Sequence, residues 1–520
     1  IDVGFLQFNG LKLERRYSSL VHPGKIVVSR FIQKLTGISL AALKKAPAWS
    51  TVQDDLADLA EHTIVAYNAG FEQSFLASTL GSAVQYADGL NLLPLCFPGA
   101  ANFRLETFLA YWQLKPAEAH LGLADAEDML KVMLTAVYNL RHHYPEQDLF
   151  LREKFATYQL AQTWIGKFFH LDDLALVDLA GEIDFTIPEL PQAAALLAPS
   201  SAGAAIGLEE DSSTPPGAPA DDASLGKRRT SSEDLSFSGA FIEKLLRDAD
   251  LMGRTYPQHQ FRQGQVDMAR RVGQALKNNV HAMIQAPTGT GKTLAYLLPA
   301  MLLATVEGEK VLIATGTKTL QRQILGQEIP RVRQLLGLRE EECPVAFMIG
   351  SQNHLCPQKL ATAQNGRLWP QESEEVRWAF LYLASIIFFN EQLLRHQDVT
   401  HQCRLLSRAA ISSAWKSKYP VLAQLETELA VDFRYCAGPR CPHAKCCAYQ
   451  GGIKLARQAA LIIGNHALLL AWPRGLERPR KIIIDEAQGM EKDATEAFHW
   501  ELGQKSLASL VDRLRDKTLL

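Results

Sequence analysis

The chain has almost no net charge: 54 lysines and arginines nearly balance 56 aspartates and glutamates, which leaves −2 over 520 residues. This balance excludes an overall basic surface, so any nucleic-acid site must be a local patch or channel. Long hydrophobic runs are also missing. The longest candidate, residues 294–306, is much shorter than the ~20 residues of a membrane span and contains Pro299. We therefore expect no membrane partner.

Cysteine is scarce and unevenly placed. Of eight cysteines, four crowd into residues 436–447. Because no secretory signal is visible, this clustering indicates metal binding rather than disulfides. A start methionine is missing as well, since the chain opens at Ile1 in a strand-like pattern and closes at Leu520 soon after an acidic motif. We expect about three domains from the length, in a fragment of a longer protein.

The stretch Ala286-Pro-Thr-Gly-Thr-Gly-Lys-Thr293 has the composition of a phosphate-binding loop. We expect a short buried strand over 281–285 and a core helix over 294–306 on either side of it. The glycines permit a tight turn whose N–H groups point at phosphate oxygens. Lys292 would reach the β- and γ-phosphates of ATP, and the Thr293 hydroxyl would bind Mg²⁺. The expected ATP-binding residues are Thr288, Gly289, Thr290, Gly291, Lys292 and Thr293.

The segment Lys481-Ile-Ile-Ile-Asp-Glu-Ala-Gln488 reads as a buried strand that ends in two carboxylates. Asp485 would hold Mg²⁺ and Glu486 would polarise the attacking water, a division of labour that suits phosphoryl transfer. Gln265, upstream of the loop, lies in a segment that resembles the adenine-side element of superfamily II helicases, which implies that its amide reads the adenine edge; an ordinary polar helix start is the alternative. The loop and the carboxylate pair, in this order, predict a RecA-like ATPase lobe, an α/β fold with a parallel sheet.

These motifs resemble those of superfamily II helicases. Arg262-x-x-Gln265 resembles their adenine-side element, and residues 310–321 resemble motif Ia, which touches the DNA backbone in that family. The carboxylate motif resembles Walker B in its Asp-Glu-Ala-His form, with Gln488 in place of His. An amide can still donate and accept hydrogen bonds, so the effect of Gln488 on coupling between nucleotide and DNA stays open.

Residues 349–356, the cysteine-rich segment 436–447 and Asn465-His-Ala-Leu together resemble the iron–sulfur helicases of the DinG/XPD type. Thiolates suit either an iron–sulfur cluster or zinc, and spacing alone does not decide between them. The resemblance implies a [4Fe–4S] cluster beside the DNA path. Its implied ligands are Cys356, Cys436, Cys441 and Cys447, with Cys446 as the alternative fourth ligand.

The same resemblance implies a bacterial, cytoplasmic and nucleoid-associated helicase that uses ATP to move 5′ to 3′ on single-stranded DNA. Forked or flapped DNA would be its substrate in repair or replication, with replication or repair proteins as candidate partners. Two alternatives stay open. One is an ATP-gated single-strand exonuclease that does not unwind DNA, and the other is a non-enzymatic DNA-binding module with a Cys₄ zinc site.

The first part of the chain carries a second resemblance. Asn68-Ala-Gly-Phe-Glu72 and His120-x-x-x-x-Asp125-Ala are similar to the second and third motifs of the DnaQ-like (DEDDh) 3′–5′ exonucleases, which have an RNase H-like fold. In that family four acidic residues hold two divalent metals and the histidine is the general base. Glu72 and Asp125 would then be metal ligands, and His120 the base.

Two departures from the exonuclease pattern leave its activity open. Glu72 stands where the family has Asp, and the first motif, Asp-x-Glu, would lie ahead of residue 1. Glu72 could instead only complement the positive end of its helix.

We expect four segments along the chain. An exonuclease-like domain with a helical extension covers 1–190, and a flexible linker dominated by Ala, Ser, Gly, Pro and Asp covers 191–239. The first RecA-like lobe covers 240–338 and 459–520, and a mostly helical iron–sulfur insertion covers 339–458.

Overall fold

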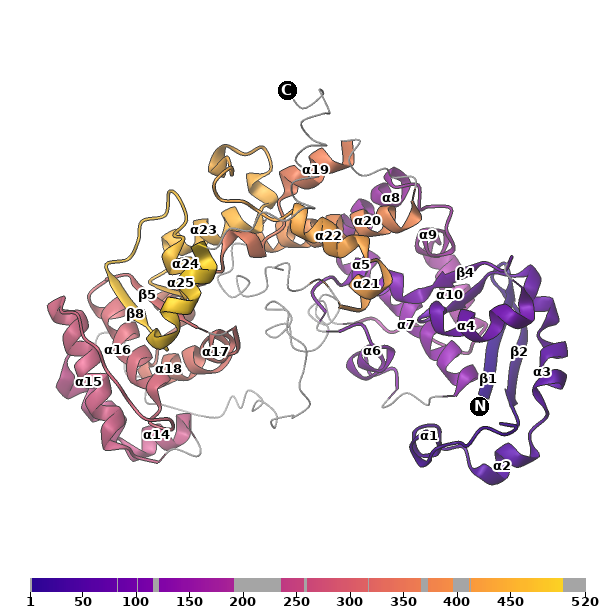
Figure 1. Ribbon diagram of the computed structural model, residues 1–520, viewed down its shortest axis with the longest axis horizontal. Coiled ribbons are helices and arrows are strands. Elements are labelled where there is room, and N and C mark those ends of the chain that lie inside the picture. Colours follow the sequence, from indigo (N-terminus) through magenta and orange to yellow (C-terminus); the bar gives the residue numbers. More distant parts are fainter. Residues whose placement is uncertain are drawn as a thin grey trace. The chain divides into compact units, whose positions relative to one another are not determined.

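The chain divides into two compact units, one formed by Ile1–Ser213 with Asn353–Gly451 and the other by Thr214–Gln352 with Gly452–Leu520 (Figure 1). The expected linker lies outside the described residues up to position 234. The computed structural model describes residues 2–81, 83–100, 102–115, 121–190, 235–256, 260–316, 318–365, 373–395, 411 and 413–498.

The second unit is built on a four-stranded sheet in the order β6-β7-β5-β8, in which every pair is parallel. Its strands are rich in Val, Ile and Leu because helices cover a parallel sheet on both faces. The carboxyl ends of parallel strands meet at one edge, so the residues after β5, β7 and β8 come together there. The strands are β5 (Val311–Thr315), β6 (Val345–Phe347), β7 (Leu461–Asn465) and β8 (Lys481–Ile484).

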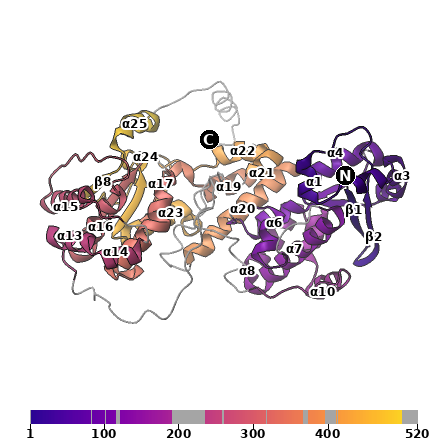
Figure 2. The same ribbon diagram turned by 90° about the horizontal axis from the view of Figure 1, so that it is seen from below.

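Helices α13, α15 and α16 lie side by side in this unit (Figure 2). Helix α16 follows the glycine loop and buries almost its whole length in the core. The predicted α/β lobe with a parallel sheet is confirmed. The helices are α13 (Gly239–Arg247), α14 (Ala249–Thr255), α15 (Gln263–Asn278), α16 (Lys292–Val306), α17 (Lys318–Gln323), α18 (Ile329–Leu336), α24 (His466–Leu470) and α25 (Met490–Phe498).

The predicted buried strand over 281–285 is wrong. These residues form no strand, and the Met283 side chain is fully exposed. A strand needs a hydrogen-bonded neighbour, and in the described part of the chain β8 pairs with β5 alone. The other edge of β8 thus forms no ladder with residues 281–285, and these residues do not join the sheet.

The predicted start of the insertion also needs correction. Residues 339–352 were assigned to it, yet they include β6, which is hydrogen-bonded to β7 in the sheet. The apolar run Val345–Phe347 is short, and its partner lies more than a hundred residues later, so only the pairing reveals it as a strand.

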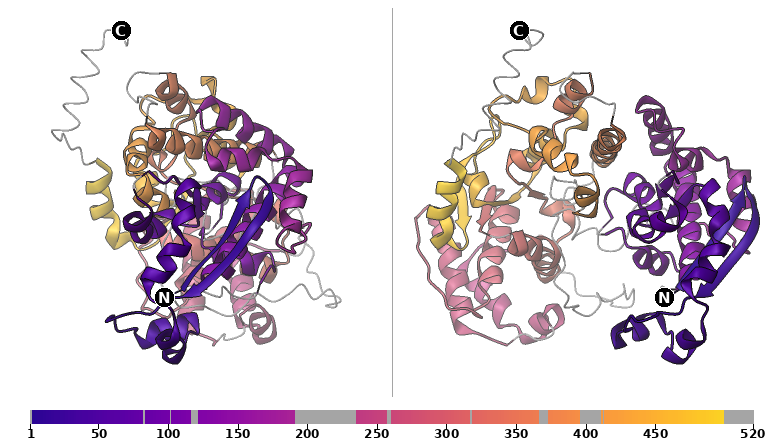
Figure 3. Two further views of the ribbon diagram at one scale, coloured as in Figure 1. Left: turned by 90° about the vertical axis from the view of Figure 1, so that its right-hand side faces the viewer. Right: turned by 45° about the vertical axis from the view of Figure 1, so that its right-hand side comes forward.

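The first unit opens with the antiparallel hairpin of β1 (Asp2–Asn9) and β2 (Lys12–Leu20), drawn as two indigo strands in Figure 3. Helix α7 (Gly122–His143) packs against β1 so closely that a Cβ on Gly4 would lie 1.9 Å from the backbone nitrogen of Leu123. A separate parallel pair joins β3 (Ile64–Ala66) to β4 (Tyr86–Asp88). The remaining helices are α1 (Arg30–Thr36), α2 (Leu40–Lys45), α3 (Trp49–Asp55), α4 (Ala69–Leu80), α5 (Leu92–Cys96), α6 (Leu105–Tyr111), α8 (Pro145–Thr157), α9 (Trp164–His170) and α10 (Asp173–Gly181).

The inserted segment contributes helices to this first unit. Helix α20 packs against α5 and α8, and one continuous hydrophobic core contains residues from both parts of the chain (Figure 1). None of the described helices combines the length and the hydropathy that crossing a bilayer demands. The inserted helices are α19 (Pro357–Asn365), α20 (Glu374–Arg395), α21 (Ser413–Lys418), α22 (Val421–Glu428) and α23 (Ala448–Gln458).

Candidate functional site

The glycine loop has the backbone that a phosphate cradle requires. Gly289 and Gly291 have φ angles of +80° and +79°, in the left-handed region that glycine adopts without strain. The Thr290 hydroxyl donates to the Pro287 carbonyl at 2.7 Å and closes the turn. The Lys292 ammonium donates to the Ala286 carbonyl at 3.3 Å, across the mouth of the loop. The loop leads directly into α16, whose positive N-terminal end favours anions.

Gln265 lies behind the loop. Only 4% of it is exposed, and its side-chain amide donates to the Gly291 carbonyl at 3.0 Å. A Cβ on Gly291 would lie 2.1 Å from this amide nitrogen, so the Gln265 side chain would have to shift, and the positive φ is what favours glycine here. The structure thus brings Gln265 to the loop, while its reading of adenine stays a prediction.

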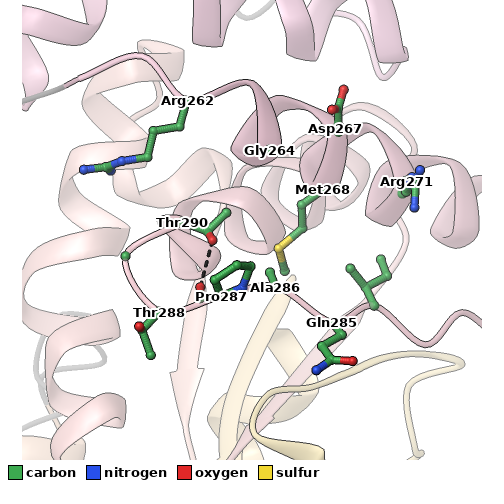
Figure 4. A pocket seen from close by; sticks show the side chains of 12 residues that line it. Arg262, Gly264, Asp267, Met268, Arg271, Gln285, Ala286, Pro287, Thr288 and Thr290 are labelled. Atoms are coloured by element: carbon green, nitrogen blue, oxygen red, sulfur yellow. Dashed lines mark hydrogen bonds between the residues drawn. The ribbon is translucent and has the colours of Figure 1, made fainter.

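A cavity of about 490 Å³ lies between the loop and the start of α15, within the size range of small-molecule sites. The Met268 side chain points toward the loop residues in Figure 4. The lining combines the apolar Met268 and Ile284 with the charged Arg262, Asp267 and Arg271, and Thr288, Gly289 and Thr290 form its floor. The predicted adenine-side segment and the loop therefore share one cavity.

Tyr296 connects the two elements that carry the predicted magnesium ligands. Its hydroxyl donates to Asp485 Oδ2 at 3.0 Å, and Thr293 lies three residues earlier on α16. Burial, and then the negative charge of Asp485, raises the pKa of Tyr296, so the phenol keeps the proton it donates. The end of β8 and the start of α16 are thus held together at the carboxyl edge of the sheet.

The turn after β8 is shaped by His466. Glu486 has the left-handed φ of 54°, and its N–H donates to Asp485 Oδ1 at 2.9 Å. The fully buried His466 ring contacts the Asp485 carbonyl at 2.8 Å through Nε2 and Asp493 Oδ2 at 2.5 Å through Nδ1. Both partners are oxygen acceptors, so the ring donates to both only when it carries two protons. His466 therefore ties the turn of Glu486 to α25.

Cys356 and Cys436 are brought close together by backbone pairing. Leu355 forms an antiparallel bridge with Ala430, and the Cys356 N–H donates to the Leu429 carbonyl at 2.8 Å. Cys436 Sγ accepts from the Gly438 N–H at 3.4 Å. A pairing between residues more than seventy positions apart thus joins the two parts of the predicted thiol group.

The thiols of this group act on one another electrostatically. Burial, and then several neighbours that include Cys356, raises the pKa of Cys446 to about 11 and that of Cys447 to about 12. Cys441 is among the neighbours that raise the pKa of Cys446, and Cys436 among those that raise the pKa of Cys447. In the ranges the structure describes, no three His, Cys, Asp or Glu side chains converge to hold a single metal ion. The thiols therefore lie near one another, but in the described ranges they do not converge on a single metal position.

The exonuclease-like residues are only partly brought together. Glu72 lies in the first turn of α4, Asp125 in the first turn of α7, and Asp88 at the end of β4. Glu72 Oε2 is buried without a hydrogen-bond partner, and burial, together with the Asp88 charge, raises the pKa of Glu72. His120 lies outside the described residues. The roles of Glu72, Asp125 and His120 stay predictions.

Three residues of the site had no predicted role. Tyr296 is three residues after Thr293, a helical spacing that places both on one face of α16. His466 lies in the Asn-His-Ala-Leu segment, which was noted only as part of a pattern. The role of Asp493 could not be predicted from the sequence, because its contact with His466 depends on how α24 and α25 pack.

Comparison with known proteins agrees with this geometry. Residues 267–351 match the family described as DEAD/DEAH box helicase. The protein named 3′-5′ exonuclease DinG of Bacillus subtilis (strain 168) is 26% identical over 551 residues, which cover 100% of this chain and 51% of that relative. ATP-dependent helicase DinG of Mycobacterium tuberculosis (strain ATCC 25177 / H37Ra) is 28% identical over 269 residues, 49% of this chain and 38% of the relative.

A third relative, ATP-dependent DNA helicase YoaA of Haemophilus influenzae, is 28% identical over 254 residues, 47% of this chain and 36% of the relative. The chain therefore spans about half of the Bacillus relative and less of the others. The resemblance to DinG-type helicases, first drawn from the motifs, is confirmed.

Proposed function

We propose that this chain carries the first motor lobe of an ATP-dependent DNA helicase of the DinG type, which moves 5′ to 3′ on single-stranded DNA. The observation that carries the proposal is the hydrogen bond from the Tyr296 hydroxyl on α16 to Asp485, beside a glycine loop with two left-handed glycines. That link supports one composite site, in which the loop cradles phosphates and the end of β8 supplies carboxylates. Forked or flapped DNA would be the substrate, in repair or replication.

Each residue of the site has a defined task in this proposal. Lys292 would exchange its contact with the Ala286 carbonyl for β- and γ-phosphate oxygens. Thr293 and Asp485 would hold Mg²⁺, which would neutralise phosphate charge when bound. Glu486, held in its left-handed turn, would orient and polarise the attacking water.

The first test is ATP hydrolysis by the protein with and without single-stranded DNA. Lys292→Ala should abolish hydrolysis, because it removes the charge that the γ-phosphate needs in the transition state. Lys244→Ala is the matched control, since Lys244 is an exposed lysine on α13. Equal hydrolysis by both variants would defeat the proposal and favour a non-enzymatic binding module.

We further propose that Cys356, Cys436, Cys441 and Cys447 hold a [4Fe–4S] cluster, with Cys446 as the alternative fourth ligand. We infer this choice over zinc from the resemblance of the thiol-bearing segments to the iron–sulfur helicases, since thiolates alone suit either group.

A coupled 3′–5′ exonuclease activity is the second candidate function. The full-chain similarity to a relative named 3′-5′ exonuclease DinG favours it, and the unpartnered Glu72 Oε2 would suit one of two divalent metals. Digestion of 3′-labelled single strands with Mn²⁺ or Mg²⁺ is the test. Glu72→Gln should abolish digestion and leave ATP hydrolysis unchanged. Digestion that persists in this variant would exclude Glu72 from the site.

A further inference from the structure

We propose that the inserted helices α20 and α21 are a built-in docking partner of the exonuclease-like domain. In this proposal the contact, with Lys418 at its polar centre, holds the domain in place independently of the chain connection through residues 191–234. The inference does not depend on ATP hydrolysis or on nuclease activity.

The apolar part of the contact is a row of aromatic pairs between α20 and α8. The Phe388 ring stacks on Phe150 with 4.2 Å between centroids. The Trp378 ring meets Phe155 edge-on at 6.0 Å. Further along, Phe380 stacks on Tyr158 at 6.4 Å. Both sides give up large apolar surfaces to each other, which is how a permanent interface gains its stability.

The short helix α5 depends on this cover. All five of its residues are buried, and it packs between α7 of the domain and α20 of the insertion. The Ser385 hydroxyl on α20 donates to the Leu95 carbonyl at 2.8 Å, which satisfies an acceptor at the C-terminal end of α5. Without the insertion, α20 would no longer cover Leu92, Leu95 and that carbonyl.

Lys418 supplies the polar centre. Its ammonium lies 2.6 Å from Asp88 Oδ2 and 2.6 Å from Asn91 Oδ1, and the Tyr419 hydroxyl donates to the same Asn91 oxygen at 3.1 Å. Asp88 and Asn91 are only 8% and 5% exposed, so water does not replace these partners. Two buried polar groups of the domain thus take hydrogen bonds from the insertion, which fixes how the surfaces fit together.

The contact has a consequence for the whole protein. Asp88 ends the strand beside β3, and its charge acts on Glu72 in α4. The candidate nuclease residues and the thiol group therefore belong to one compact unit, although the chain between them runs through the ATPase lobe. A movement of the insertion would carry the exonuclease-like domain with it.

The test uses the whole chain with a specific protease site placed within residues 191–234. After cleavage the two pieces should elute together in gel filtration. Lys418→Glu combined with Ser385→Trp should weaken their association at least about tenfold, because it buries a repelled charge and blocks α5. Lys34→Glu on exposed α1 is the control and should leave the pieces together.

An exposed ion pair provides a second test in case the first variant does not fold. Arg395 Nη1 lies 2.9 Å from Glu146 Oε2 at the rim of the contact, with both side chains more than half exposed. Arg395→Glu should weaken association roughly twofold to fivefold, and adding Glu146→Arg should restore it. Separation of the unmodified pieces after cleavage would overturn the proposal. The proposal would also be overturned if Arg395→Glu did not weaken the association and adding Glu146→Arg did not change it.

Discussion

The Tyr296 hydroxyl donates a hydrogen bond of 3.0 Å to Asp485 Oδ2 and so connects the helix after the glycine loop to the end of β8. Tyr296 is 2% exposed, and Thr293 lies three residues earlier on the same helix. The hydrogen bond therefore links the two elements that carry the predicted magnesium ligands. Its contribution can be measured without hydrolysis.

Tyr296→Phe should weaken Mg²⁺-dependent nucleotide binding by about tenfold, since a hydrogen bond to a charged group contributes about 1.5–3 kcal/mol. The measurement is a Mg²⁺ titration of a fluorescent ATP analogue bound to the protein. Tyr256→Phe is the matched control, because Tyr256 donates at 3.1 Å to the Glu328 carboxylate, which has no predicted metal-binding role. An unchanged Mg²⁺ midpoint in Tyr296→Phe would show that the link is not used.

His466→Ala should lower the rate of ATP hydrolysis by roughly tenfold to a hundredfold while nucleotide binding stays near normal. The reason is that Glu486 loses the support of its left-handed turn, and only the positioning of water suffers. Asp493→Asn should act in the same direction through the ring. If the double variant His466→Ala/Asp493→Asn hydrolyses ATP no more slowly than His466→Ala alone, the two residues act through the same contact. Fully additive losses in the rate of hydrolysis would contradict this.

Gly291→Ala should abolish nucleotide binding. Its φ of +79° is strained for alanine, and the new Cβ would lie 2.1 Å from the Gln265 amide. Gly253→Ala is the contrasting control on α14, where a Cβ meets nothing within 4 Å, and it should raise stability by about 0.5–1 kcal/mol. Binding of the fluorescent analogue and thermal unfolding measure both effects. Normal binding by Gly291→Ala would contradict the loop geometry.

The alkaline stability of the protein should depend on Tyr256. Burial, and then the charge of Glu328, raises the pKa of Tyr256 above its ordinary value of 10.0. The folded state therefore holds this proton more tightly than the unfolded chain, so the stabilisation is present below pH 10 and is lost as the pH rises above it.

Tyr256→Phe should thus reduce the fall in the free energy of unfolding between about pH 8 and about pH 11, measured in urea. Tyr435→Phe is the control, because Tyr435 is 84% exposed, and it should match the unmodified protein. An equal pH dependence in all three proteins would exclude the buried phenol as a cause.

Local patterns carried most of what could be predicted. The helix after the loop and the strand β8 were predicted correctly, because the pattern that indicates each lies in neighbouring residues. The loop glycines were predicted for the right reason, since both adopt positive φ. The strand over 281–285 failed because strand formation depends on a pairing partner, which no local pattern supplies.

The remaining features come from contacts between distant residues. Asp88 and Lys418 are separated by more than three hundred positions, and nothing in either neighbourhood indicates the other. His466 and Asp493 meet because α24 and α25 pack together, and periodicity does not encode that contact. Charged and polar partners of this kind are visible only once the fold has placed them.

The most direct measurement is the iron and acid-labile sulfide content of the protein purified without oxygen, together with its visible spectrum. A DinG-type helicase with a cluster at Cys356, Cys436, Cys441 and Cys447 predicts about four irons and about four sulfides per chain, lost in Cys441→Ser. Cys343→Ser is the control and should retain both iron and sulfide, since Cys343 is buried in the hydrophobic core of the second unit. One zinc, no sulfide and no colour would contradict the iron–sulfur proposal and favour the zinc-binding module.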